Sequence, residues 1–248
     1  MRAMVLAAGL GTRLRPLTND RPKALVILGG RTLLEITLIR LREFGIGEVI
    51  INLHHFADLV VDYLKKTGNF GMQIEFSRED PLLDTGGGLK QAAWFLREGS
   101  SGDEPFILHN VDVISNIDLG RMVETHLESR ALATIAVQQR KTSRYLLFDQ
   151  QLQLCGRRSA GQDKPELARA VQPAHELAFT GIHVISPRIF PLLTEEGIFP
   201  IVPAYLRLAA QGEKIQAFRA DGYYWRDLGK PENLQQAEKD MREKIIRD

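Results

Sequence analysis

The first half of the chain alternates between short apolar runs and longer amphipathic stretches. The apolar runs have the length and near-continuous hydrophobicity of strands buried on both faces. They predict strands over residues 3–8, 48–53, 72–77, 105–109 and 131–137. The stretches between them carry apolar residues at helical spacing. They predict helices over residues 33–44, 57–66, 88–97 and 119–129.

Polar residues at the ends of these stretches support the predicted helices. Thr32 is placed to cap the first one, and Glu35, three residues on, completes the pattern of a capping box. Gly45 follows its last apolar residue, as is common at a helix C-terminus, and Asp118 precedes the helix over 119–129. Strands separated by such helices pair in parallel. The pattern therefore predicts a three-layer α/β sheet, which binds ligands beyond the carboxyl ends of its strands.

The second half of the chain has a different pattern, with shorter apolar runs and more polar spacers. A polar stretch over residues 156–172 predicts a flexible loop. No repeat or linker interrupts the chain, so we expect one domain over residues 1–248 with a small antiparallel lobe inserted near 140–180. The remaining predicted elements are strands over 145–148, 152–154, 177–185, 215–218 and 224–226, and helices over 200–210 and 234–246.

Composition excludes several classes of protein. The chain has 248 residues, with 32 Lys plus Arg against 31 Asp plus Glu, so its net charge of +1 argues against a nucleic-acid polymer as partner. Hydrophobic residues make up 44%, too many for a disordered chain. No apolar run approaches the roughly 18 residues of a membrane helix. The single cysteine, Cys155, cannot form an internal disulfide, which fits a cytoplasmic protein. A homo-oligomer is compatible with all of this.

The N-terminus could be mistaken for a signal peptide. Its apolar part is short and runs directly into Gly11-Thr12-Arg13, with no small-residue cleavage site. We therefore expect a buried first strand here.

A glycine-containing loop, Gly9-Leu10-Gly11, follows the first strand and is open to three interpretations. A dinucleotide-binding fold would need a glycine at Leu14, an uninterrupted helix where Pro16 stands, and an acidic residue at the end of the second strand. A P-loop would need Gly-Lys-Ser/Thr, which is missing. The third interpretation is a loop that holds a triphosphate, with Arg13 neutralising its charge.

The longer stretch around this loop resembles the signature of the sugar-1-phosphate nucleotidyltransferases, also called nucleotide-sugar pyrophosphorylases. The resemblance extends over nearly the whole chain and implies a Rossmann-like nucleotidyltransferase fold. The matching motifs are Leu6-Ala7-Ala8-Gly9-x-Gly11-Thr12-Arg13-Leu14-x-Pro16-Leu17-Thr18, Arg21-Pro22-Lys23-Ala24-Leu25-Val26, Asp84-Thr85-Gly86-Gly87-Gly88, Asn110-Val111-Asp112-Val113, Phe179-Thr180-Gly181-Ile182 and Trp225-Arg226-Asp227-Leu228-Gly229.

The resemblance implies a reaction in which a sugar 1-phosphate attacks the α-phosphorus of a nucleoside triphosphate and pyrophosphate leaves. Both reactants are anions, so catalysis consists of positioning and charge neutralisation. Arg13 would hold the departing phosphates, and Lys23 would neutralise charge near the α-phosphate. Taken alone, each would be a solvated surface cation. The implied nucleotide-binding residues are Ala8, Gly9, Gly11, Thr12, Thr85, Gly86 and Gly87.

Asp112 and Asp227 are the candidate metal ligands. Each follows an apolar strand, and Mg²⁺ prefers a few carboxylates together with phosphate oxygens. In the family, the corresponding positions hold such a metal. Outside the motif, Asp112 would be an ordinary turn residue and Asp227 a residue that flanks a helix.

Val111 departs from the family pattern, which usually has a glycine before the first aspartate. We therefore expect activity with altered metal geometry or sugar fit.

Two further segments are assigned by the resemblance. The glycines of residues 84–88 would let a base or sugar lie against the backbone, with main-chain amides as donors. Glu79 is a weaker candidate for the neighbourhood of the base, and Thr180 and Gly181 would lie near the sugar.

The sequence thus predicts an enzyme that makes a nucleoside-diphosphate sugar with Mg²⁺. The sugar (N-acetylmuramate, mannose, heptose or another) and the triphosphate (UTP, GTP or another) stay open. The main alternative is a non-catalytic homologue that binds sugar nucleotides, for which Val111 is the only support.

Overall fold

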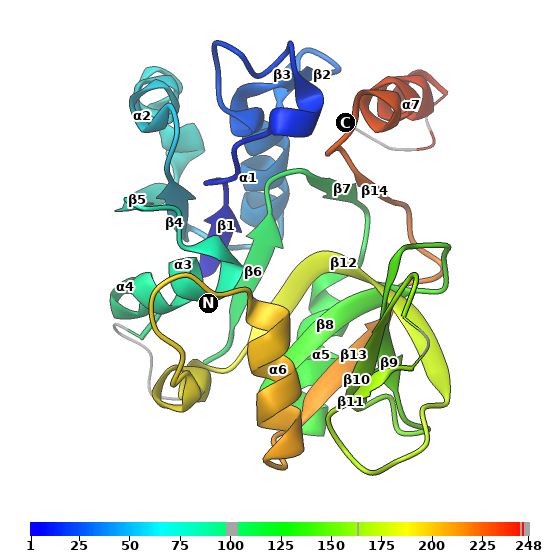
Figure 1. Cartoon of the computed structure of the whole chain (residues 1–248). Coiled ribbons are helices and arrows are strands. Elements are labelled where there is room, and N and C mark those ends of the chain that lie inside the picture. Colours follow the sequence, from blue (N-terminus) through cyan, green and yellow to red (C-terminus); the bar gives the residue numbers. More distant parts are fainter. Residues whose placement is uncertain (98–103, 163, 244, 246–248) are drawn as a thin grey trace.

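The computed structural model describes residues 1–97, 104–162, 164–243 and 245. Its centre is a ten-stranded mixed sheet in the order β11-β10-β9-β12-β6-β1-β4-β5, with β8 paired to β12 and β13 (Figure 1). The strands are β1 (Ala3–Leu6), β4 (Glu48–Leu53), β5 (Gln73–Arg78), β6 (Phe106–Asn110), β8 (Ala133–Gln138), β9 (Arg144–Phe148), β10 (Leu154–Ser159), β11 (Glu166–Leu167), β12 (His175–Ile185) and β13 (Ile215–Arg219).

The parallel part of the sheet is the part predicted from the first half of the chain. β1 pairs in parallel with β4 and β6, and β4 with β5. β12 is inserted antiparallel between β6 and β8, so β8 does not pair with the other predicted parallel strands. Two short antiparallel pairs lie outside the sheet: β2 (Ile27–Leu28) with β3 (Arg31–Thr32), and β7 (Val113–Ser115) with β14 (Trp225–Asp227).

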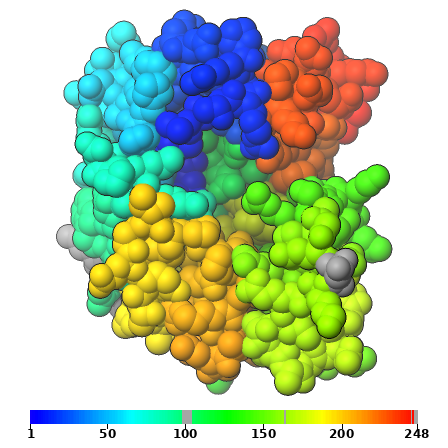
Figure 2. Space-filling view, viewed as in Figure 1, coloured from blue at the N-terminus to red at the C-terminus, as the bar shows by residue number. Residues whose placement is uncertain are grey.

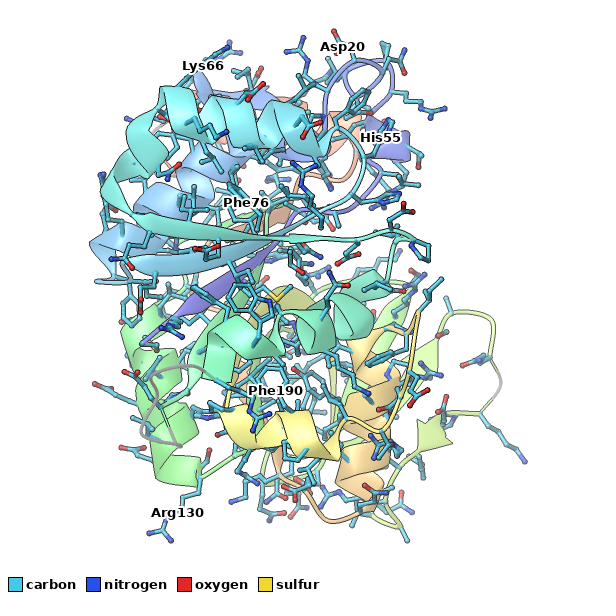
Figure 3. All side chains as sticks on the ribbon, turned by 90° about the vertical axis from the view of Figure 1, so that its left-hand side faces the viewer. Asp20, His55, Lys66, Phe76, Arg130 and Phe190 are labelled. Carbon is cyan, nitrogen blue, oxygen red and sulfur yellow. The ribbon has the colours of Figure 1, made fainter. Side chains whose placement is uncertain are left out.

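Helices cover both faces of the sheet. Successive strand residues point to opposite faces, so Met4 belongs to one core and its neighbour Val5 to the other. Lys66, at the end of α2, and Phe190, in η4, lie on opposite sides of the sheet (Figure 3). The helices are α1 (Leu33–Glu43), α2 (Ala57–Lys66), α3 (Asp84–Gln91), α4 (Ala93–Arg97), α5 (Leu119–Ser129), α6 (Ile201–Ala210) and α7 (Pro231–Arg242), with short turns η1 (Thr12–Leu14), η2 (Lys23–Leu25), η3 (Gly68–Gly71) and η4 (Pro187–Leu192).

The predicted start signals of α1 and α5 are confirmed, with one difference. The Thr32 and Asp118 side chains accept hydrogen bonds from backbone N–H groups three residues on. The Glu35 carboxylate, however, accepts a hydrogen bond from the Tyr63 hydroxyl at 2.9 Å. Glu35 therefore ties α1 to α2 rather than completing the predicted capping box.

Several other predictions need correction. Residues 156–172 are not simply a loop, because β10 and β11 pair within them and β10 also pairs with β9. Strands pair through main-chain hydrogen bonds, which polar residues also form, so the polarity of the side chains alone does not identify a loop. α3 begins at Asp84, earlier than the predicted 88, and Ala92 separates it from α4. The last helix, predicted over 234–246, begins at Pro231 and ends at Arg242, and residue 246 lies outside the described residues.

Among the described residues, no helix has the length and hydrophobicity needed to cross a membrane.

Candidate active site

A cavity of about 510 Å³ opens at the carboxyl ends of the parallel strands. Figure 2 shows it as a hollow between the upper and lower halves of the molecule. The segments that follow β1, β5 and β6 meet there, at the edge of the sheet where the sequence pattern predicts ligand binding. The lining residues are Leu6, Ala7, Ala8, Gly9, Leu10, Gly11, Thr12, Arg13, Lys23, Asn52, Glu79, Leu82, Asp84, Thr85, Asn110, Val111, Asp112, Ile198 and Gly229.

The loop after β1 turns at Gly11, whose φ of 63° is left-handed and favours glycine. A Cβ on Gly11 would stand 3.1 Å from Thr18 Cγ2 and 3.2 Å from Lys23 Cβ. The Thr18 hydroxyl donates to the Gly11 carbonyl at 2.9 Å. The loop is thus packed tightly against the segment that carries Lys23, which fixes both relative to the cavity.

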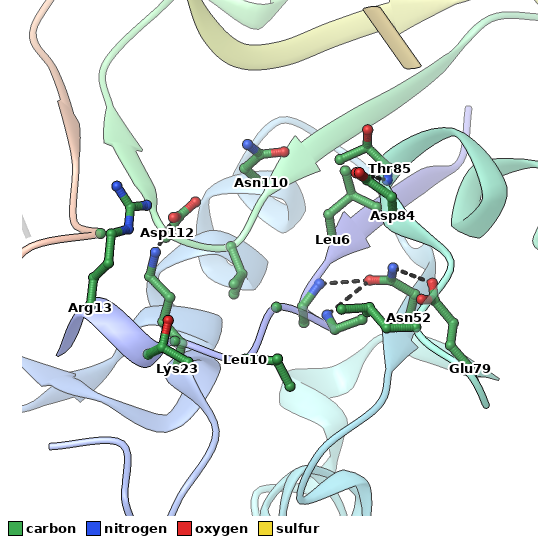
Figure 4. A pocket seen from close by; sticks show the side chains of 18 of the residues that line it. Leu6, Leu10, Arg13, Lys23, Asn52, Glu79, Asp84, Thr85, Asn110 and Asp112 are labelled. Atoms are coloured by element: carbon green, nitrogen blue, oxygen red, sulfur yellow. Dashed lines mark hydrogen bonds and ion pairs between the residues drawn. The ribbon is translucent and has the colours of Figure 1, made fainter. Parts of the chain in front are cut away.

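Asn52, at the end of β4, fixes the other side of the loop (Figure 4). Its Oδ1 accepts hydrogen bonds from the N–H groups of Ala7 and Ala8 at 2.7 and 3.3 Å. Its Nδ2 donates to Glu79 Oε1 at 2.7 Å, and Glu79 Oε2 accepts from the N–H of Leu83 at 2.9 Å. A buried network therefore connects the segments that follow β1, β4 and β5.

The sequence interpretation missed Asn52. The available signal was a polar residue inside an otherwise apolar strand, because a buried amide needs hydrogen-bond partners.

Lys23 and Asp112 form an ion pair at the cavity wall (Figure 4). Their side chains are only 10% and 19% exposed, so water screens the pair little. The two residues are 89 positions apart in the chain. The structure therefore brings together a predicted catalytic cation and a predicted metal ligand.

Asp227 lies beside Asp112 because β14 pairs with β7. The N–H of Leu228 donates to the Asp112 carbonyl at 2.8 Å. Asp227 Oδ1 accepts a hydrogen bond from the N–H of Gly229, which lines the cavity. A Cβ on Gly229 would stand 2.6 Å from both Asp227 Oδ1 and a terminal nitrogen of Arg13. Arg13, Lys23 and Asp112 therefore line one end of the cavity, and Asp227, which does not line it, contacts the lining residue Gly229.

Val111 fits its position without strain. It is buried, its φ is not positive, and its N–H donates to the Leu6 carbonyl at 3.1 Å. Position 111 therefore does not require the φ that only glycine adopts readily, and the altered metal geometry or sugar fit stays a prediction.

Thr180 and Gly181 do not line the cavity, and they lie behind Asn110, which does. The Thr180 hydroxyl is buried and donates to the Ala136 carbonyl at 2.8 Å. Gly181 has a φ of 84°, and a Cβ there would stand 2.8 Å from Asn110 Nδ2. Because Gly181 has no Cβ, the Asn110 side chain, which lines the cavity, packs directly against the backbone of residue 181.

Residues 84–88 form the first turns of α3 rather than an open loop. Asp84 and Thr85 line the cavity. The N–H groups of Gly86 and Gly87 both donate to the Phe199 carbonyl, at 2.9 and 3.1 Å. These two amides face the neighbouring chain segment instead of the cavity, where they were expected to serve as donors to a base or sugar.

A buried histidine supports the strand that leads to Asn110. Burial and the charge of nearby Arg40 lower the pKa of His109 to about 3, so this ring is neutral at pH 7. Its Nδ1 lies 2.8 Å from the Asn110 carbonyl, and its Nε2 lies 3.4 Å from Arg40. Arg40 also donates to the Ser115 hydroxyl at 2.6 Å, which links α1 to β7.

A model of the nucleotidyl transferase family matches residues 2–244. The chain belongs to this family. It is 33% identical over 239 residues to an N-acetylmuramate alpha-1-phosphate uridylyltransferase of Caulobacter vibrioides, a match that covers 93% of the chain and 92% of that relative. It is 29% identical over 252 residues to a UTP–glucose-1-phosphate uridylyltransferase of Haloferax volcanii, covering 98% of the chain and 97% of the relative.

A solved structure has the same fold. HddC from Yersinia pseudotuberculosis, complexed with GMP-PN, superposes with a TM-score of 0.74 at 22% identity, covering 97% of the chain and 99% of that structure. The predicted Rossmann-like nucleotidyltransferase fold is confirmed. This nucleotidyl transferase is an enzyme that transfers a nucleoside monophosphate to a sugar 1-phosphate, giving a nucleoside-diphosphate sugar.

Proposed function

We propose that the transfer takes place in the 510 Å³ cavity, at the end where Arg13, Lys23, Asp112 and Asp227 gather. An oxygen of the sugar 1-phosphate forms a bond to the α-phosphorus of the triphosphate. The bond from that phosphorus to the bridging oxygen of the β-phosphate breaks, and pyrophosphate carries away the electron pair. The supporting observation is the meeting of two cations and two carboxylates from three segments that lie far apart in the chain.

The loop after β1 holds the triphosphate in this proposal. The backbone from Ala8 to Thr12 is pinned by Asn52 on one side and by Thr18 and Lys23 on the other. A fixed backbone with its N–H groups near phosphate oxygens costs no reorganisation when charge develops. Arg13 neutralises the departing pyrophosphate, and Lys23 neutralises the reacting phosphates.

The nucleobase lies toward Thr85, on the opposite wall of the cavity. Gly86 and Gly87 act there by packing, since their amides are occupied by Phe199. The sugar lies toward Asn110, whose position depends on Gly181 and, behind it, Thr180.

Asp112 and Asp227 would hold Mg²⁺. Hard carboxylate oxygens on adjacent strand segments suit this ion, which completes its shell with phosphate oxygens and water. Each carboxylate uses one oxygen in its contact with Lys23 or Gly229, so each keeps another for a cation. When bound, the ion would neutralise phosphate charge. The side chains of Lys23 and Arg13 orient the same phosphates.

The activity test uses purified protein with MgCl₂, each of several triphosphates and a panel of sugar 1-phosphates, read by pyrophosphate release. UTP is the first donor to test because two relatives are uridylyltransferases. Asp112→Ala and Asp227→Ala should abolish turnover. Asp62→Ala is the matched control, because Asp62 is exposed on α2 and does not line the cavity. Release in no combination would overturn the proposal, and so would full turnover in either aspartate variant.

The non-catalytic alternative has no remaining support. It rested on Val111, and Val111 adopts an ordinary backbone conformation beside a complete set of charged residues.

A further inference from the structure

A second cavity of about 490 Å³ lies against the antiparallel strands β9 and β12. Its wall is polar and mostly cationic. The charged and aromatic residues that line it are Arg140, Lys141, Tyr145, His175, Glu176 and Arg219. None of these belongs to the motifs that identify the reaction.

Arg140 is held in this cavity in an unusual way. Its guanidinium carbon stacks 3.8 Å from the centre of the Trp225 ring. One terminal nitrogen donates to the Phe179 carbonyl at 2.8 Å. Its Nε is buried and has no hydrogen-bond partner among the described residues. Because the Nε N–H is shielded from solvent, only the terminal nitrogens of this guanidinium can face the cavity, and guanidinium nitrogens bind the oxygens of carboxylate and phosphate.

The charges around Arg140 are not balanced inside the cavity. Glu176 is paired with Arg158, and Arg219 is paired with Asp221. In the described part of the chain, Arg140 and Lys141 form no ion pair. Burial lowers the pKa of Arg140, and the charge of Asp227 acts against this shift, but arginine stays protonated in proteins. The cavity therefore carries an excess of positive charge.

The cavity adjoins the reacting end of the active site. Trp225, under the Arg140 guanidinium, donates from Nε1 to the Thr180 carbonyl at 2.7 Å and lies two residues before Asp227. Arg140 and Trp225 thus both bind the backbone of the segment that places Asn110. The Asp227 carboxylate lies close enough for its charge to act on Arg140, so Arg140 lies near the reacting end of the active site.

We propose that this cavity is a subsite for an anionic substituent of the sugar, so that the preferred substrate is a sugar 1-phosphate bearing a second acidic group. Arg140 binds that group directly, and Lys141 adds to the positive field. The proposal rests on the proposed function. It concerns specificity, because the substituent takes no part in the bond that forms.

The test compares matched pairs of sugar 1-phosphates that differ in one acidic group. N-acetylglucosamine 1-phosphate against N-acetylmuramate 1-phosphate tests a carboxylate. Glucose 1-phosphate against glucose 1,6-bisphosphate tests a phosphate. We expect the acidic member of at least one pair to have a kcat/KM roughly tenfold or more above its neutral partner, the size typical of a charge-assisted contact. The pair that shows the preference identifies the acidic group.

Variants then locate the preference. Arg140→Gln should remove it, lowering kcat/KM at least about fivefold more for the acidic sugar than for its neutral partner. Arg140→Lys should restore part of it, and Lys141→Gln should weaken it. Arg144→Gln is the control, because Arg144 is exposed, lies near the same strand edge and does not line the cavity.

Three results would overturn the subsite. Neutral and acidic sugars could be used equally well. Arg140→Gln could lower both equally, which would make Arg140 a general support of the active site. Lys141→Gln and Arg140→Gln could both leave an existing preference intact. If no sugar releases pyrophosphate, the proposed function fails, and calorimetric binding of the same pairs with a non-hydrolysable triphosphate still decides the subsite.

Discussion

At the scale of single residues, the cavity depends on side chains that satisfy one another across distant segments. The Lys23–Asp112 pair and the Asn52–Glu79 pair each join positions far apart in the chain. Both pairs are largely shielded from water, so removing one partner leaves the other unpaired and poorly solvated. The effects of substitution should therefore be larger than for surface pairs.

Lys23→Met should reduce kcat about 10²- to 10³-fold, the typical loss for one preorganised charge at a reacting centre. Steady-state pyrophosphate release measures this. Lys66→Met, the same substitution at an exposed position on α2, should stay within about twofold of wild type. Equal losses in both variants would contradict a specific role for Lys23.

Asn52→Leu should lower the free energy of unfolding by about 1–3 kcal/mol, because Glu79 and the N–H of Ala7 lose their buried partner. Urea denaturation followed by circular dichroism measures the change. Asn19→Leu, the same substitution at an exposed position, is the control. A loss no greater than that of the control would refute the network.

At the scale of elements, the start of α3 is fixed against the segment that leads into α6. Phe199 accepts two N–H groups from α3, and the Thr85 hydroxyl accepts the N–H of Ile201 at 3.0 Å. The glycines of α3 allow this close approach. α3, which carries Thr85 at the cavity, is therefore coupled to α6.

Gly86→Ala should destabilise the protein by about 1–3 kcal/mol, since its Cβ would overlap the Phe199 ring and carbonyl. It should also raise the KM for the triphosphate by displacing Thr85. Gly222→Ala is the control, because a Cβ there meets nothing within 4 Å. Thermal unfolding and steady-state kinetics measure both effects. Unchanged KM and stability would contradict the coupling.

At the scale of the whole molecule, both cores contain or adjoin histidines that are buried in the neutral form. Burial is the main cause of the lowered pKa of His109, His126 and His183, to about 3, 4 and 3 against 6.5 in the unfolded chain. The unfolded chain therefore binds more protons than the native state between these values. This contribution to stability is fully present above pH 6.5 and is lost progressively as the pH falls from 6.5 toward 3.

Each of these histidines should contribute a slope of about 1.4 kcal/mol per pH unit to the free energy of unfolding below pH 6. Urea unfolding at pH 7.5, 6 and 5 measures the slope. Replacing His126 with Gln should reduce it by about one third if the three contribute equally. A free energy of unfolding that does not change between pH 7.5 and 5 would show that these histidines titrate normally.

Local sequence patterns predicted the parallel strands of the sheet and several residues of the candidate site. Continuous apolar runs predicted the parallel strands, because strands buried on both faces need apolar residues on both faces. The glycine-containing loop, Arg13, Lys23, Asp112 and Asp227 were found by motif. The roles of these residues were implied by the resemblance.

Tertiary structure decided the rest, because the deciding contacts lie between segments far apart in the chain. β12 entered the sheet antiparallel, and β10 and β11 paired within a stretch predicted as a loop, since main-chain hydrogen bonds depend on neighbours rather than on side-chain polarity. The Phe199 carbonyl accepts the N–H groups of Gly86 and Gly87, so these amides do not face the cavity. Arg140 belongs to no motif of the sequence, and only the folded structure places its guanidinium over the Trp225 ring.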